Sequence, residues 1–142
     1  MLLTTKGRYA VSAIIDLAQN NKDCNVSPRT ISDISEKQNI SVSYLEQIFN
    51  KLKKAGIVNS VKGPGGGYML SDVPEQINIS DIIRAVEEPI KFTKCNDHVK
   101  CNKNEKCQTH NLWKGLENHV IAYLSNISVA DVCRENSLAT NI

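Results

Sequence analysis

The strongest restriction on the fold is the order of the elements that the first half of the sequence predicts. Three helices come first, the last two joined by the brief turn Asn39-Ile40, and two short strands then flank a glycine-rich loop. The order is typical of a winged helix-turn-helix, so the expected fold class is mainly α with a small β-hairpin. The first helix is expected from Thr4 or Thr5 to about Gln19, the second over about 30–38, and the third from Ser41 or Ser43 to before Gly56. The strands are expected at 57–61 and 68–70, and the loop between them is Gly63-Pro64-Gly65-Gly66-Gly67.

Polar residues mark the expected helix ends. Thr30 stands three residues before Asp33, as in a capping box, and Ser43 stands three residues before Glu46 in the same way. The third helix is therefore expected to begin at Ser41 or Ser43 and to end before Gly56. Ser80 is expected to cap a further helix, which Pro89 ends.

The second half of the chain carries a long helix with an apolar stripe. Residues 111–124 place Leu112, Leu116, Val120 and Tyr123 on one face. A stripe this apolar is expected to be covered by a second copy of the chain around a two-fold axis. The full predicted division is a winged helix-turn-helix domain at 1–75, a linking helix at 76–92, a polar loop at 93–110, the long helix and a short helix (129–134) within 111–135, and a flexible tail at 136–142.

Bulk properties set the class of protein. The N-terminal apolar run is too short for a signal peptide, and no stretch approaches the roughly 20 apolar residues of a membrane span, so a cytoplasmic protein is expected. The five cysteines are an odd number, which favours metal binding over disulfides in a reducing compartment. No paired carboxylates, nucleophile–base motif or phosphate loop points to an enzyme.

The third predicted helix is placed to read DNA. A recognition helix lies in the major groove with its N-terminal residues at base edges, and the first turns here offer Ser41, Ser43, Tyr44 and Gln47 as hydrogen-bonding side chains. The loop from Lys62 to Gly67 is the expected wing, whose bare N–H groups can approach phosphates. As a simpler alternative, Ser41 or Ser43 only caps the helix and the lysines only form a solvated face. The helix order, the wing and the basic residues favour DNA binding only when they are taken together. The basic residues that can neutralise phosphates are Lys6, Arg8, Lys51, Lys53, Lys54 and Lys62.

Three cysteines lie where the apolar pattern disappears. Successive cysteines are separated by five residues, and a histidine follows the last one after two others. Thiolates are the preferred ligands of iron–sulfur clusters, and imidazole can replace one of them. The tight pairs that structural zinc sites favour are absent, but zinc on three cysteines and a histidine stays an alternative, as does His98 as the fourth ligand. The candidate ligands are Cys95, Cys101, Cys107 and His110.

The sequence resembles the Rrf-type family of dimeric winged-helix transcription regulators, and within it the branch that senses iron–sulfur clusters. The similarity covers nearly the whole chain. Thr109-His110 followed by Leu112-Trp113 points to that branch. The departures are Lys62, where arginine is usual, and a short segment after Cys133. The segments that carry the wider likeness are Leu3–Val11, Ile40–Gln47 and Gly63–Tyr68.

The resemblance implies a [2Fe–2S] cluster held by three cysteines and one histidine. It implies that the cluster changes which DNA sites are preferred, and that cluster-assembly operons are repressed when clusters are plentiful. The implied partners are a double-stranded DNA operator, a second copy of the chain and cluster-assembly proteins as cluster donors. The side chains that the resemblance directs to the major groove are Ser41, Ser43, Tyr44, Glu46 and Gln47.

Other readings compete with this one. A nitric-oxide-sensing branch of the family shares the cysteines, although His110 after Cys107 favours the cluster sensor. A cluster-free branch is disfavoured by the three clustered cysteines. A zinc-stabilised winged-helix regulator keeps the fold without the sensor. An electron carrier would not need a helix-turn-helix.

Overall fold

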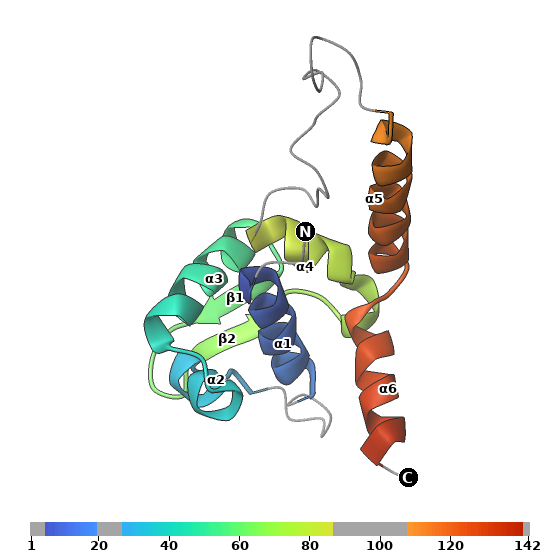
Figure 1. Ribbon diagram of the computed structural model, residues 1–142. Helices are drawn as coiled ribbons and strands as arrows, with labels where there is room; N and C mark the ends of the chain where they lie inside the picture. The colour runs from blue at the N-terminus through green and yellow to red at the C-terminus, as the bar shows by residue number, and fades with distance from the viewer. Residues whose placement is uncertain (1–4, 20–26, 87–107, 141–142) are drawn as a thin grey trace.

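The computed structural model describes residues 5–19, 27–86 and 108–140, and its architecture is the expected one, mainly helical with a two-stranded antiparallel hairpin. Figure 1 shows the three N-terminal helices and the hairpin as one body, with the two C-terminal helices beside it. Within the described parts, no helix combines the length and apolar character needed to cross a bilayer. The elements are α1 (Thr5–Gln19), α2 (Ile31–Gln38), α3 (Val42–Lys54), β1 (Val58–Val61), β2 (Gly67–Leu70), the 3-10 helix η1 (Pro74–Gln76), α4 (Ile79–Val86), α5 (His110–Ser125) and α6 (Val129–Thr140).

The start and turn of the helix-turn-helix follow from local chemistry. The Thr30 hydroxyl accepts a hydrogen bond from the Asp33 N–H (3.0 Å), which confirms the predicted cap of α2. Asn39 ends α2 in the left-handed region (φ 56°). Ser41 caps α3 by accepting from the Tyr44 N–H (3.3 Å). The predicted Ser43–Glu46 capping box is therefore wrong, because Ser43 already lies inside the first turn.

The end of α3 is fixed by glycine. Gly56 has φ 79°, its N–H donates to the Lys53 carbonyl (3.0 Å), and the Ile57 N–H donates to the Leu52 carbonyl (3.0 Å). This hydrogen-bond pair defines a Schellman motif, and its left-handed residue favours glycine. The chain then enters β1 directly, so the recognition helix and the hairpin share one rigid junction.

The hairpin carries the wing. β1 pairs antiparallel with β2, from Val58 opposite Leu70 to Val61 opposite Gly67. At its tip, the Gly66 N–H donates to the Gly63 carbonyl (2.9 Å) across Pro64 and Gly65, and Gly65 has φ 76°. Proline followed by a left-handed glycine is the pattern of a type II turn. The tip is therefore a tight, preorganised loop.

The packing of the backbone around Gly66 and Gly67 requires glycine at both positions. A Cβ on Gly67 would lie 2.3 Å from the Arg29 carbonyl oxygen, and one on Gly66 would lie 2.2 Å from the Val61 carbonyl oxygen. Both obstacles are backbone and cannot swing aside. Close approach of chain to chain thus requires these two glycines, whatever the loop binds.

Gly67→Ala is expected to lower the free energy of unfolding by about 1–3 kcal/mol, since the new methyl group collides with the backbone carbonyl of Arg29 and forces it away from β2. Chemical denaturation of the purified variant measures the loss. Gly65→Ala is the matched control, because a Cβ there meets open space and only the left-handed backbone is penalised, by about 1 kcal/mol. Equal losses at both positions would contradict the steric explanation.

Helix α6 packs against α1, and α5 packs against α4. The Ile79 N–H donates to the Ile127 carbonyl (3.0 Å) and the Val129 N–H donates to the Ile77 carbonyl (2.8 Å), so the entries to α4 and α6 lie side by side. α4 begins at Ile79, before Ser80. The predicted Ser80 cap is therefore wrong: this buried side chain accepts a hydrogen bond from the Ser125 hydroxyl (3.1 Å).

α6 is longer than the sequence suggested. Ser128 and Asp131 cap it reciprocally, through the Asp131 N–H to the Ser128 hydroxyl (3.1 Å) and the Ser128 N–H to the Asp131 carboxylate (3.0 Å). The backbone hydrogen bond from Ser128 lowers the pKa of Asp131. The helix runs to Thr140, past the predicted end at Arg134 and into the expected tail (136–142), since the segment contains neither glycine nor proline to stop it.

Candidate nucleic-acid interface

One face of α3 is polar and exposed. The opposite face, Leu45, Ile48, Phe49 and Leu52, is buried in the core, so the register of the helix is fixed. Of the predicted DNA-contacting residues, Ser43, Glu46 and Gln47 are exposed on the polar face. These side chains can donate to or accept from base edges. The whole face, in steps of three and four residues, is Ser43, Glu46, Gln47, Asn50 and Lys54.

Asn50 was not predicted as a site residue. It lies one turn beyond Glu46 and Gln47 and is exposed. An asparagine amide can pair with adenine through two hydrogen bonds. The signal was present in the sequence, because the position falls opposite the apolar stripe once the helix is extended beyond its first two turns.

Ser41 and Tyr44 also have structural roles. The Ser41 hydroxyl accepts the capping hydrogen bond of α3, which leaves its own O–H available to donate. The half-buried Tyr44 ring meets Tyr9 of α1 edge-on, with centroids 5.7 Å apart at 88°. The ring therefore joins the N-terminal turn of α3 to α1.

Basic side chains come together from α1 and α3. The adjacent Lys6 ammonium lowers the pKa of Lys51, because two positive charges placed close together disfavour protonation. The Lys51 ammonium also donates to the Val86 carbonyl at the end of α4 (3.5 Å). Two adjacent ammonium groups repel each other, and an anion such as a phosphate relieves the repulsion. Arg8 is exposed one turn before Val11 on α1.

The wing presents its tip to solvent. Lys62, Gly63, Pro64 and Gly65 are exposed, whereas Gly66 and Gly67 are half-buried. Only the first four of the six predicted wing positions are therefore freely accessible. The base of the wing contacts the recognition helix, since the Tyr68 ring lies 4.7 Å from the Phe49 ring, centroid to centroid.

Of the predicted metal ligands, only His110 lies among the described residues. It is the first residue of α5 and is half-buried. Beside it, the Trp113 indole N–H donates to the Thr109 hydroxyl (3.1 Å). Cys95, Cys101 and Cys107 lie outside the described residues, and in the part that is described no three metal-ligating side chains come together.

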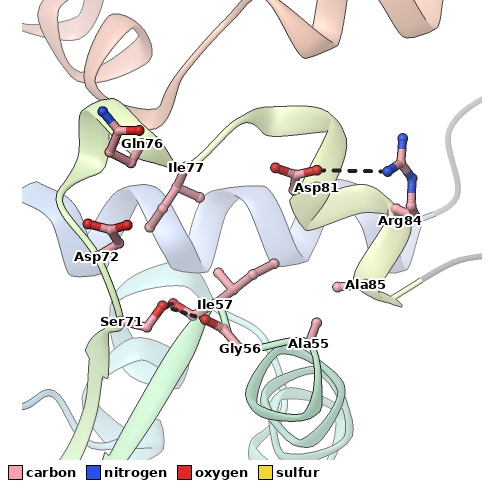
Figure 2. Close-up of a pocket in the computed structure, with 10 residues that line it drawn as sticks. All are labelled: Ala55, Gly56, Ile57, Ser71, Asp72, Gln76, Ile77, Asp81, Arg84 and Ala85. Atoms are coloured by element: carbon pink, nitrogen blue, oxygen red, sulfur yellow. Dashed lines mark hydrogen bonds and ion pairs between the residues drawn. The ribbon is translucent and has the colours of Figure 1, made fainter.

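A cavity of about 440 Å³ lies between the end of α3, the hairpin and α4 (Figure 2). Its floor is apolar, including Ile57 and Ile77. Around the rim, Asp81 pairs with Arg84 (3.9 Å), and Ser71 donates to the Ile57 carbonyl (2.9 Å). These exposed polar groups are partnered within the rim, so the cavity shows no buried polar group aimed at a ligand.

The sequence of this chain is similar to those of known transcriptional regulators. The family model Rrf2, an iron-dependent transcriptional regulator, matches residues 3–135. The transcriptional regulator IscR of Vibrio cholerae is 45% identical over 138 residues, covering 97% of this chain and 78% of that protein. IscR of Photobacterium profundum is 44% identical over the same length and coverage.

Solved structures agree with the sequence comparison. The structure of T. potens IscR is similar with a TM-score of 0.79 at 34% identity, covering 98% of this chain and 90% of that chain. The structure of CymR, the global cysteine regulator of B. subtilis, has a TM-score of 0.79 at 31% identity, covering 95% and 98%. The same fold therefore occurs in regulators of different specificity.

Proposed function

This chain belongs to the Rrf2 family of transcriptional regulators, and from that premise we propose that it is an IscR-type repressor that senses an iron–sulfur cluster. It is a DNA-binding regulator and not an enzyme. The proposed cluster is [2Fe–2S], and the cluster-loaded form represses iron–sulfur cluster assembly genes. The observation that carries the proposal is the hydrogen-bonding face of α3. The same chain contains the candidate ligands Cys95, Cys101, Cys107 and His110.

The proposed DNA contacts divide by chemistry. Gln47 and Asn50 have amides that read adenine in the major groove, and Ser43 and Glu46 contact neighbouring base edges. The ammonium groups and the backbone of the wing tip bind phosphates, which position the protein without reading sequence. The proposed phosphate-binding groups are the side chains of Lys6, Arg8, Lys51 and Lys62 and the backbone N–H groups of Gly63 and Gly65, whereas Pro64, which has no N–H, shapes the turn that presents them.

The donor set suits an iron–sulfur cluster. Three thiolates and one imidazole complete the four ligands that a [2Fe–2S] cluster requires. His110 is the first residue of α5, a regular helix that packs on α4 and whose last residue, Ser125, donates a hydrogen bond to Ser80 (3.1 Å). When bound, the cluster supplies a charged, redox-active centre that can be lost. The proposed role of residues 93–110 is to hold the cluster and to communicate its presence to the rest of the fold.

The proposed homodimer forms through α5. Three large apolar side chains of this helix are strongly exposed: Leu112 (62%), Leu116 (40%) and Tyr123 (67%). Gly115, beside this stripe, has open space around the position of a Cβ, so nothing within the described chain requires a glycine there. A closely packed second α5 would explain both features, since glycine in an exposed helix costs about 1 kcal/mol relative to alanine.

The remaining parts of the proposal follow from the regulator role. DNA binding is assigned to residues 1–75, the cluster to 93–110 and dimerisation to 111–135, with residues 76–92 as the link. A protein that reads chromosomal operators and receives clusters from assembly proteins acts in the cytoplasm.

Gln47→Ala is expected to weaken binding to the operator about fivefold to 150-fold and to relax the preference at one base pair, because a base contact is lost (about 1–3 kcal/mol). Fluorescence anisotropy with the operator and with its singly substituted versions measures both effects. Gln76→Ala, an exposed glutamine in η1, is the matched control and keeps wild-type affinity. A loss of affinity that is uniform across all sequences would show that Gln47 reads no base.

A further inference from the structure

Arg29 connects elements that are distant in the sequence. Its guanidinium lies 3.1 Å from the carboxylate of Asp16 on α1, which is only 1% exposed. The other carboxylate oxygen of Asp16 lies 2.7 Å from the Lys37 ammonium at the end of α2. A buried carboxylate strongly favours keeping its cationic partners. The Arg29 side chain is therefore held to α1.

The main chain of Arg29 is held to the wing. Its N–H donates to the Tyr68 carbonyl (3.0 Å), and its carbonyl accepts from the Tyr68 N–H (2.7 Å). Gly67 permits this approach, since a Cβ there would collide with the Arg29 carbonyl. Arg29 thus acts as a third strand, one residue long, on the outer edge of β2.

Tyr68, the partner of Arg29 on β2, also contacts the recognition helix α3. The Tyr68 ring packs on the Phe49 ring of α3, with centroids 4.7 Å apart, and Phe49 is fully buried. A continuous set of contacts therefore runs from Asp16 through Arg29 and Tyr68 to Phe49. It joins α1, the start of α2, the wing and α3.

We propose that Arg29 is a positioning residue that fixes the wing relative to the recognition helix, so that both bind DNA as one rigid unit. The inference rests on the proposed DNA interface. A wing tethered only by its own two strands would lose conformational freedom on binding, and that entropy would reduce the affinity gained from Lys62. With Arg29 in place, the wing is already ordered before DNA arrives.

The test is a double-mutant cycle between Arg29 and the wing. In the wild-type background, Lys62→Ala is expected to weaken operator binding roughly fivefold to tenfold at 0.1 M salt and to reduce the salt slope by about 0.9. In an Arg29→Met background, which keeps the aliphatic stem, Lys62→Ala is expected to cost about twofold or less. A general loss of stability would leave the Lys62 effect unchanged in folded protein, so only positioning predicts the coupling.

Lys37→Met is the matched control, because it removes the other cation of Asp16 without contacting the wing strand. In that background Lys62→Ala is expected to keep its full effect. Arg29→Lys, which retains a charge for Asp16, is expected to fold even if Arg29→Met folds poorly, and to show a Lys62→Ala effect between those of the wild-type and Arg29→Met backgrounds. An equal Lys62 effect in the wild-type and Arg29→Met proteins would overturn the positioning role while leaving the proposed DNA interface intact.

A measurement without DNA keeps the inference independent of that interface. Arg29→Met is expected to speed hydrogen exchange of the backbone amides at positions 29 and 68 at least tenfold relative to the amides that join β1 and β2, whereas Lys37→Met leaves that ratio unchanged. Unchanged exchange at these two amides would overturn the proposal. If Lys62→Ala has no effect in the wild-type protein, the proposed DNA interface fails, and the exchange result alone decides whether Arg29 holds the wing.

Discussion

Replacing Cys101 by alanine is expected to give a colourless protein without inorganic sulfide, whereas the unaltered chain, purified anaerobically, carries about two irons and two sulfides. Each cysteine supplies a thiolate, and a [2Fe–2S] cluster bound by four ligands is not retained when one is deleted. Cys95→Ala and Cys107→Ala are expected to behave alike. Visible absorption together with iron and sulfide analysis measures the loss.

The histidine gives a sharper form of this prediction. His110→Cys is expected to retain a coloured cluster with a lower reduction potential, because an additional thiolate adds negative charge and stabilises the oxidised irons. His119→Ala is the matched control: it removes the exposed histidine of the same helix and leaves the spectrum unchanged. An unchanged potential in His110→Cys, or loss of colour in His119→Ala, would contradict the ligand assignment.

Trp113 offers a second readout. It is the only tryptophan of the chain and bonds to Thr109, the residue before His110. Cluster binding next to His110 is expected to quench its fluorescence, and Cys101→Ala is expected to restore it. Stoichiometric zinc in protein prepared anaerobically with iron would overturn the sensor while leaving the DNA-binding regulator standing.

Leu116→Glu is expected to convert the protein to a monomer and to weaken operator binding about a hundredfold or more. A glutamate in an apolar interface between two α5 helices would bury an unpaired charge. Without the dimer, the two recognition helices no longer bind neighbouring half-sites together, and the avidity factor of about 10²–10⁴ disappears. Sedimentation equilibrium and anisotropy with a two-half-site operator measure the two effects.

Asn118→Glu is the matched control for this substitution. It introduces the same charge two residues further along, on the opposite and exposed side of α5, outside the apolar stripe. It is expected to remain dimeric with wild-type affinity. A Leu116→Glu protein that stays dimeric, or a wild-type protein that is monomeric at micromolar concentration, would contradict the proposed interface.

Much of the fold could be predicted because its signals are local. The apolar period placed α1, α2 and α3 nearly to the residue, and Gly56 marked the end of α3. Glycines around Pro64 indicated the hairpin. These elements depend on hydrogen bonds and side-chain spacing within about four residues, which the sequence displays directly.

Two of the helix caps predicted from local sequence patterns, at Ser43 and at Ser80, were wrong. Ser41 and Ser43 can each begin α3, and in the structure the Tyr44 N–H donates to the Ser41 hydroxyl, so Ser41 is the cap. Serine is a common cap residue, yet Ser80 lies inside α4. The helix begins one residue earlier, at Ile79, whose N–H donates to the Ile127 carbonyl. The choice depended on a partner 48 positions away in the chain.

The sequence by itself determined the class of protein, the helix-turn-helix, the wing and the candidate ligands, since each is written in residue type and spacing. The tertiary structure alone decided that Lys6 lies beside Lys51, that Gly67 passes against Arg29, and that Arg29 pairs with Asp16. Such contacts join residues whose separation in sequence carries no periodic signal. They form because burial of the shared core brings the elements together first, and charges and backbones then take the partners that this packing leaves within reach.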